Sequence, residues 1–193
     1  MNNTLKKLVQ SENKRFLYLV AIFIAALFLS AFLYVITGQK NIASINYEAI
    51  SSMSVIEIFL MTIKRNLVYF AAVILLTIFG QSKIIAGIFG LTCVYYGLSV
   101  IYLIRTLNMD IKYFILTFTD YFVFFPLLFY FTFISSTISK YTKKTKNIET
   151  ISRKFDIIVN SYIKLSLIYI IFVTAYSLGY SYYILILSRL LVG

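Results

Sequence analysis

The chain has 193 residues, of which 61% are hydrophobic, 18% aromatic and only 13% charged, and its mean hydropathy is +0.88. Soluble domains are about 45–50% apolar and about 25% charged, so this composition excludes an ordinary soluble protein. The single Cys and single Pro exclude disulfide-rich and collagenous classes. The sequence therefore predicts an all-α integral membrane protein in which residues 1–193 form one transmembrane domain.

Five apolar runs are each long enough to cross a hydrocarbon core of about 30 Å. The predicted spans cover residues 16–36, 62–82, 84–104, 113–138 and 164–187. The first run is too long for the apolar part of a signal peptide and no A-x-A sequence follows it, so we expect a retained helix. The second is the shortest, because only residues 66–82 are strictly uncharged. It could recruit residues 58–63, with Lys64 and Arg65 extending their charged ends toward the headgroups.

The basic residues are divided unequally between the two sides of these spans. Of the 18 Lys and Arg residues, twelve fall on the side of the N-terminus and six on the other side. The positive-inside rule then predicts a cytoplasmic N-terminus and an extracytoplasmic C-terminus. The same distribution accounts for the net charge of +11 without a nucleic-acid partner, because the charges lie in loops and at span edges.

Two segments between the spans have the spacing of amphipathic helices that lie at the membrane interface. The apolar face of the first, in the external loop, consists of Ile42, Ile45, Ala49, Met53, Ile56, Leu60 and Ile63. The apolar face of the second, in the cytoplasmic connection, consists of Ile148, Ile151, Phe155, Ile158, Tyr162 and Leu165. Each segment either packs on the bundle or docks a partner. Four neighbouring lysines suit anionic lipid headgroups, namely Lys140, Lys143, Lys144 and Lys146.

Side chains suited to catalysis or metal binding are scarce in this sequence. There is no His, and the one Cys, Cys93, lies inside an apolar run. These facts exclude histidine-based nucleophilic pairs, histidine-ligated zinc and an intramolecular disulfide. No GxxxxGK[ST] phosphate-binding loop is present either. We therefore predict no catalytic residue, no cofactor and no metal site, and a protein that is not an enzyme.

Asp120 is the one acidic residue inside a predicted span, and Pro126 follows it in the same span. A carboxylate in the membrane is costly, so Asp120 should face the bundle or a polar cavity. It either contacts a partner or relays protons, or it makes an ordinary interhelical hydrogen bond, and Lys64 or Arg65 could pair with it. Pro126 should kink the helix just beyond Asp120. The two residues predict an intramembrane polar site.

Small residues form one face of the third predicted span. They recur at spacings of four, three and four residues and are Ala86, Gly90, Cys93 and Gly97. Such a face lets two helix backbones approach closely within lipid. It packs either inside the chain or against a second copy, which leaves a homo-oligomer open.

The order of these features resembles the stage II sporulation protein M family over roughly residues 55–145. The resemblance rests on IFLMTIKRNLVYFAAVILLTIFG, a short turn around residues 80–83, IIAGIFGLTCVYYGLSVIYLI, TDYFVFFPLLF and KYTKK. Gly97 in YYGLSV and Pro126 match the family's landmarks. The resemblance implies a multi-pass protein of a bacterial cell membrane.

What the resemblance implies about function has two branches. In the sporulation branch, the protein is a non-catalytic scaffold that localises two peptidoglycan-degrading hydrolases. In the other branch, encoded with circular bacteriocins, it is an accessory protein of maturation, export or immunity beside a transporter and its ATPase. The short external loop and the absence of an acidic residue in the last span depart from the sporulation branch. We expect a scaffold or accessory protein, and a small ion or proton-coupled carrier is the third alternative, resting on Asp120 and Pro126.

Overall fold

The computed structural model describes residues 12–37, 47–107, 120–145 and 152–192, and the regular structure of these residues is helical. In chain order the helices are α2 (Asn13–Thr37), α3 (Tyr47–Ser52), α4 (Val55–Ile78), α5 (Ser82–Leu107), the π-helical turn η1 (Asp120–Phe124), α7 (Phe125–Thr145) and α8 (Ser152–Val192). Five helices among the described residues are long and apolar enough to cross a membrane. The prediction of a five-span, all-α membrane protein is confirmed to this extent.

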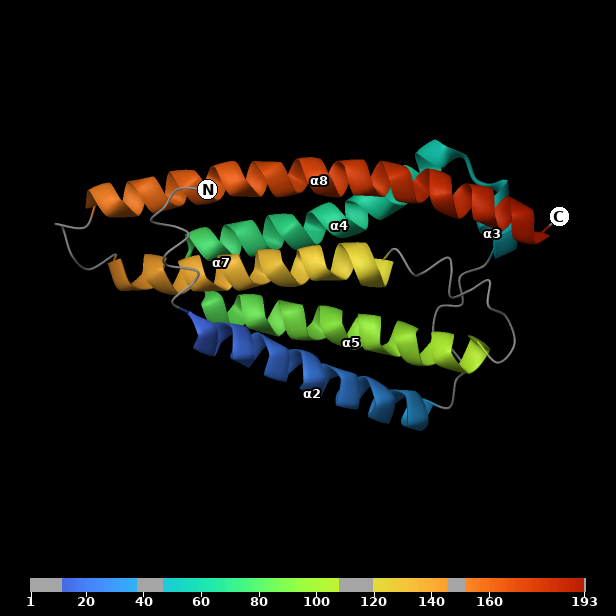
Figure 1. Cartoon of the computed structure of the whole chain (residues 1–193), viewed down its shortest axis with the longest axis horizontal. Coiled ribbons are helices and arrows are strands. Elements are labelled where there is room, and N and C mark those ends of the chain that lie inside the picture. Colours follow the sequence, from blue (N-terminus) through green and yellow to red (C-terminus); the bar gives the residue numbers. More distant parts are fainter. Residues whose placement is uncertain (1–11, 38–46, 108–119, 146–151, 193) are drawn as a thin grey trace.

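The long helices lie roughly side by side, with α7 between α4 and α5 (Figure 1). On the outer sides, α2 packs on α5 and α8 packs on α4. The first residues of α2 and the last residues of α8 lie at opposite ends of the bundle (Figure 1). Many large apolar side chains of α2 and α8 are exposed on the outer surface of the bundle, as expected for helices that contact lipid.

The start of α4 differs from the predicted interfacial helix over residues 42–63. Ser54 ends the preceding segment and caps α4, because its hydroxyl accepts a hydrogen bond from the Glu57 backbone while the Glu57 carboxylate accepts one from the Ser54 backbone. This capping box separates the short α3 from α4. The prediction of one continuous helix through this segment is therefore wrong. Ile42 and Ile45 of the predicted apolar face lie outside the described residues.

Two residues of the predicted apolar stripe face away from the bundle, whereas Met53 packs against a buried cluster that includes Ile58. Ile56 and Leu60 are 69% and 56% exposed, whereas the neighbouring Ile58 and Thr62 are buried. In lipid the environment outside the protein is itself apolar, so apolar side chains face outward and small or polar ones face other helices. The buried face of α4 is accordingly mixed, and it consists of Ile58, Thr62, Asn66, Phe70, Val73 and Thr77.

A tight turn joins α4 to α5 where the sequence predicts one. Helix α4 ends at Ile78, earlier than the predicted residue 82, and α5 begins at Ser82. Gly80 has a φ of +74°, a conformation that glycine adopts without steric cost. The Gly80 and Gln81 amides donate to the carbonyl oxygens of Thr77 and Leu76, at 3.1 Å and 2.9 Å. The second span therefore extends toward the N-terminus, through Lys64 and Arg65, rather than toward residue 82.

Helix α7 is the most enclosed helix of the bundle, and every residue from 131 to 139 is buried. This stretch contains five hydroxyl side chains, namely Thr132, Ser135, Ser136, Thr137 and Ser139. Small hydroxyl residues allow close helix packing and can hydrogen-bond across helices or back to their own backbone. The low hydropathy of α7 thus reflects a protein-facing position.

Helix α8 is one uninterrupted helix of 41 residues. At 1.5 Å per residue it is about 60 Å long, about twice the thickness of a hydrocarbon core. The predicted interfacial helix and the predicted span over 164–187 are therefore parts of one helix from Ser152 onward. Ile158 and Tyr162 of the predicted apolar face pack inside the bundle, and Ile148 and Ile151 lie outside the described residues.

Candidate functional site

A cavity of about 420 Å³ lies between α4, α5 and the start of the fourth span. One wall consists of Arg65, Asn66 and Tyr69 of α4, and the facing wall includes Thr92, Tyr95 and Tyr96 of α5. The floor consists of Phe124 of η1 and Leu128 of α7, which are 2% and 1% exposed. Its volume is within the range of about 300–1,000 Å³ typical of small-molecule sites. This cavity is a candidate for a binding site.

The cavity lies near the middle of the membrane-spanning region. The uncharged part of α5 extends over residues 84–104, between Lys83 and Arg105. Thr92 and Tyr95 lie close to the centre of that stretch, about 15 Å from either surface of a hydrocarbon core of about 30 Å. Arg65 lines the same cavity and is exposed at the surface of the bundle.

Asn66 orients the guanidinium group of Arg65. The Arg65 Nε donates to Asn66 Oδ1 at 3.2 Å, and the Asn66 Nδ2 donates to Ser177 Oγ of α8 at 3.3 Å. Asn66 is only 2% exposed, and its hydrogen bond to Ser177 holds the amide group against α8. A guanidinium has five N–H donors and stays charged in proteins, so Arg65 brings a permanent positive charge to the cavity.

The structure describes only part of the predicted intramembrane site at Asp120 and Pro126. The backbone of Asp120 begins η1, one turn before the cavity-lining Phe124, and its side chain lies outside the described residues. Pro126 is the second residue of α7 and is exposed on the bundle surface. A π-helical turn lies directly before it, where the proline ring prevents an α-helical bond to the carbonyl of Phe122. The predicted kink itself stays a prediction.

The small-residue face of α5 packs inside the chain, against α2. Ala86 and Cys93 are buried, and a Cβ atom added to Gly90 would lie 3.2 Å from Ile22 Cγ2. A Cβ added to Gly97 would lie 2.9 Å from Ser30 Cβ. The Ser30 hydroxyl also donates to the Val94 carbonyl oxygen at 3.0 Å, across the two helices.

The predicted lipid-contacting lysines have different surroundings. Lys140 Nζ forms an ion pair with Glu12 Oε2 at 3.6 Å, and its side chain is half exposed. Lys143 and Lys144 lie on the last turn of α7, with side chains outside the described set, and Lys146 lies outside the described residues.

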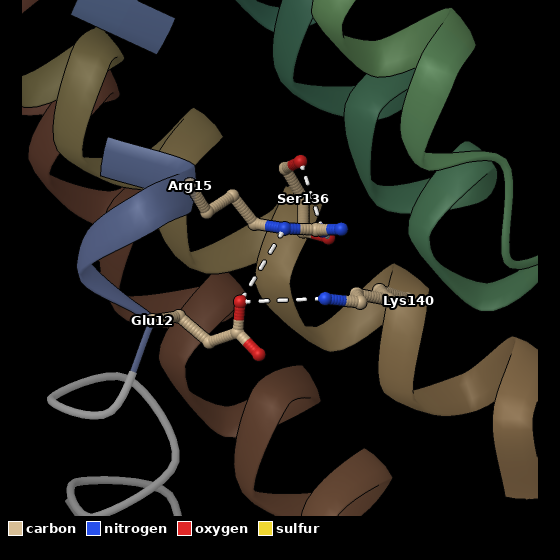
Figure 2. Close-up of polar contacts among 4 residues, drawn as sticks. All are labelled: Glu12, Arg15, Ser136 and Lys140. Carbon is tan, nitrogen blue, oxygen red and sulfur yellow. Dashed lines mark hydrogen bonds and ion pairs between the residues drawn. The ribbon is translucent and has the colours of Figure 1, made fainter. Parts of the chain in front are cut away.

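Figure 2 shows a polar cluster that the sequence did not reveal, between the start of α2 and α7. The Arg15 guanidinium donates to the Ser136 backbone carbonyl, and to Ser136 Oγ at 3.2 Å. Arg15 Nε lies 3.9 Å from the Glu12 carboxylate, which is also the partner of Lys140 (Figure 2). The cluster joins two helices that are about 120 residues apart in sequence.

Hydroxyl groups also connect the buried faces of α4, α7 and α8. The Tyr162 hydroxyl donates to Thr77 Oγ1 at 3.1 Å and lies 2.8 Å from Ser135 Oγ. The Tyr69 hydroxyl lies 2.6 Å from Thr132 Oγ1. These side chains serve packing, and they give the cavity walls a fixed position.

Sequence reasoning did not identify Arg65 and its tyrosine neighbours as one site. The sequence signal was the basic pair Lys64 and Arg65 beside an apolar run. We interpreted this pair as two side chains whose charged ends extend toward the headgroups. Among the described residues, no group of three His, Cys, Asp or Glu side chains could hold a metal ion. The cavity therefore combines one cationic side chain with a mainly aromatic and aliphatic lining.

In three comparisons, the chain matches no family model, no curated protein and no solved structure. The resemblance to the stage II sporulation protein M family therefore stays a prediction.

Proposed function

We propose that this chain is a non-catalytic membrane scaffold or accessory protein of the stage II sporulation protein M type. It organises other membrane or envelope proteins rather than transforming a substrate. The proposal includes a bacterial cell membrane, a cytoplasmic N-terminus and an extracytoplasmic C-terminus. The landmarks of the resemblance support it, because the Gly80 turn forms a tight helical hairpin and Gly97 seats α5 on α2.

The observation that carries the proposal is the end of the bundle at which α7 finishes and α8 begins. In Figure 1 these two helix ends extend beyond the ends of α2, α4 and α5. We call them the projecting helix ends. Their sequence is rich in basic residues, including Lys143, Lys144, Arg153 and Lys154. A projecting basic helix pair offers a surface to an acidic segment of a partner protein, close to the anionic headgroups of the cytoplasmic leaflet.

The circular-bacteriocin accessory role is the alternative within the same class. Both roles require a stable partner, and they differ in its identity. Cell-wall hydrolases are the partners expected of the sporulation scaffold, and a transporter with its ATPase is the partner expected of the accessory protein.

Affinity purification from a gentle detergent, followed by mass spectrometry, tests the proposal. We expect one of these partner sets to co-purify with the wild-type chain. The double substitution Lys143→Gln and Lys144→Gln should reduce the recovered partner several-fold, since it removes charge from the projecting helix ends. Lys83→Gln is a control for loss of one charge at the start of α5, at the same end of the bundle. Each of the single substitutions Lys143→Gln and Lys144→Gln is compared with it.

Two results would contradict the proposal. A chain that purifies alone from its native membrane has no stable partner to organise. Ion or proton flux through the purified protein in liposomes, abolished by Asp120→Asn, would support the carrier instead.

A further inference from the structure

We infer that the cavity between α4 and α5 holds one acyl chain of a membrane lipid, which comes from the leaflet that faces away from the Gly80 turn. This site is separate from the projecting helix ends and does not depend on the scaffold function.

The cavity is a cleft between the two arms of the α4–α5 hairpin. Each arm packs on α7, and Phe124 of η1 and Leu128 of α7 close the cleft on the inner side. On the outer side, Leu91 and Tyr95 of α5 form a rim and are 74% and 54% exposed. Because this rim lies near the centre of the uncharged stretch of α5, the cleft opens sideways into the hydrocarbon. Its occupant must therefore come from the hydrocarbon.

Polar side chains of the lining are already hydrogen-bonded within the chain. The Tyr69 hydroxyl lies 2.6 Å from Thr132 Oγ1, and the Thr92 hydroxyl donates to a backbone carbonyl oxygen of its own helix at 2.9 Å. Asn66 forms hydrogen bonds with Arg65 on one side and with α8 on the other. Groups with such partners gain little from a polar ligand. The lining thus offers mainly aromatic and aliphatic surface, which suits an uncharged hydrocarbon chain.

The spacing of the lining residues indicates the direction of this chain. Helices α4 and α5 leave the Gly80 turn as antiparallel arms, so residues equally distant from Gly80 lie roughly opposite each other. Tyr69 and Leu91 are each 11 residues from Gly80, whereas Arg65 and Tyr95 are each 15 residues away. The cationic end of the cleft is therefore the end farther from the turn. A lipid of that leaflet enters with its headgroup on this side and its chain pointing toward the turn.

The volume of the cleft fits a lipid chain better than a partner helix. One turn of an α-helix is about 5.4 Å long and at least about 10 Å wide with its side chains. A single turn would therefore fill the whole cavity of about 420 Å³, and the rest of a transmembrane partner or of a second copy would lie outside it. A lipid chain fills the cleft and gains dispersion contacts that an empty cleft lacks. Because the surrounding hydrocarbon is equally apolar, packing and not the hydrophobic effect holds the chain.

Photolabelling of the full-length protein in liposomes tests this inference. The probe is a phosphatidylcholine with a diazirine midway along one acyl chain and an alkyne at the end of that chain. We expect labelled residues on the inner walls, Tyr69 and Tyr96, as well as at lipid-facing positions such as Phe28 of α2, which is 74% exposed. Thr92→Phe fills the cleft without changing any charge. It should lower the labelling of Tyr69 and Tyr96 several-fold and leave the labelling of Phe28 unchanged.

Leu91→Trp is a second filling variant, because this exposed rim position accommodates a larger side chain. Ile84→Phe is the matched control, since it adds a ring on the exposed side of the same helix, outside the cavity lining. Its labelling should equal that of wild type, and size-exclusion elution and thermal unfolding identify folded variants.

The same acyl chain on phosphatidylglycerol should label the inner walls equally, since the lining selects a chain and not a headgroup. Three results would each overturn the inference. They are inner-wall labelling that both folded filling variants leave unchanged, labelling confined to exposed positions, and a several-fold preference for one headgroup.

Discussion

Arg15 ties the start of α2 to the centre of the bundle through hydrogen bonds. Its guanidinium reaches the Ser136 backbone and hydroxyl on α7 while Glu12 lies beside it (Figure 2). Its side chain is 14% exposed, so water replaces these contacts poorly if they are lost. By contrast, the Lys140 side chain that pairs with Glu12 is 50% exposed. Exposed ion pairs contribute little to stability, so Arg15 matters more than Lys140.

Arg15→Gln should lower the free energy of unfolding by about 1.5–3 kcal/mol, the range for hydrogen bonds to charged groups. Lys14→Gln removes the same charge from the neighbouring exposed position and should change this free energy by less than about 0.5 kcal/mol. Reversible unfolding in mixed detergent micelles measures both values. Equal destabilisation by the two substitutions would mean that net charge, and not the contact with α7, is responsible.

At the scale of the helix, the closest approach of α5 to α2 depends on Gly97. Substitution of Gly97 by Ala adds a Cβ atom 2.9 Å from Ser30 Cβ and 3.3 Å from Leu27 Cδ2, so the two helices must separate. Overpacking of this kind costs about 1–3 kcal/mol. Gly87→Ala is the control because nothing lies within 4 Å of the added atom. We expect a clear decrease of the melting temperature for Gly97→Ala and none for Gly87→Ala, and a similar decrease in both would contradict the packing role of Gly97.

The sequence predicts the helices of this protein better than it predicts their limits. Hydropathy identifies five spans because the bilayer requires about 20 apolar residues for each crossing. It misplaces the start of α4, where the Ser54 and Glu57 capping box decides the boundary locally. Hydropathy also divides α8 into two elements. Basic residues near Arg153 are typical of a loop between spans, whereas in this fold they lie on the same helix as the last span.

The site was harder to predict than the fold, since the cavity requires α4, α5 and the start of the fourth span to meet. The spacing of residues on one helix reveals the small face of α5, yet it contains no information on which helix faces Arg65. Tyr95 and Thr92 appear in the sequence only as parts of an apolar run. Their contribution to one cavity follows from tertiary packing, which periodicity does not encode.

At the scale of the whole molecule, the distribution of basic residues along the bundle predicts how the protein is oriented in the membrane. The starts of α2, α5 and α8 and the end of α7 lie at one end (Figure 1). The basic residues on these helix ends include Lys14, Arg15, Lys83, Lys143, Lys144, Arg153 and Lys154. Because basic segments are retained in the cytoplasm, this end should be cytoplasmic. Gln81 of the α4–α5 turn then faces the cytoplasm, and Ser52 at the end of α3 faces the outside.

Single cysteine substitutions measure this orientation directly in a Cys93→Ser background, which has no other thiol. A membrane-impermeant maleimide should label Ser52→Cys in intact cells and should label Gln81→Cys only after permeabilisation. Both positions are exposed in the fold, so access to the reagent depends on the side of the membrane. The opposite pattern would reverse the orientation and place the projecting helix ends outside the cell. In that case their basic residues would face envelope components, and a cytoplasmic partner such as a transporter ATPase would be excluded from them.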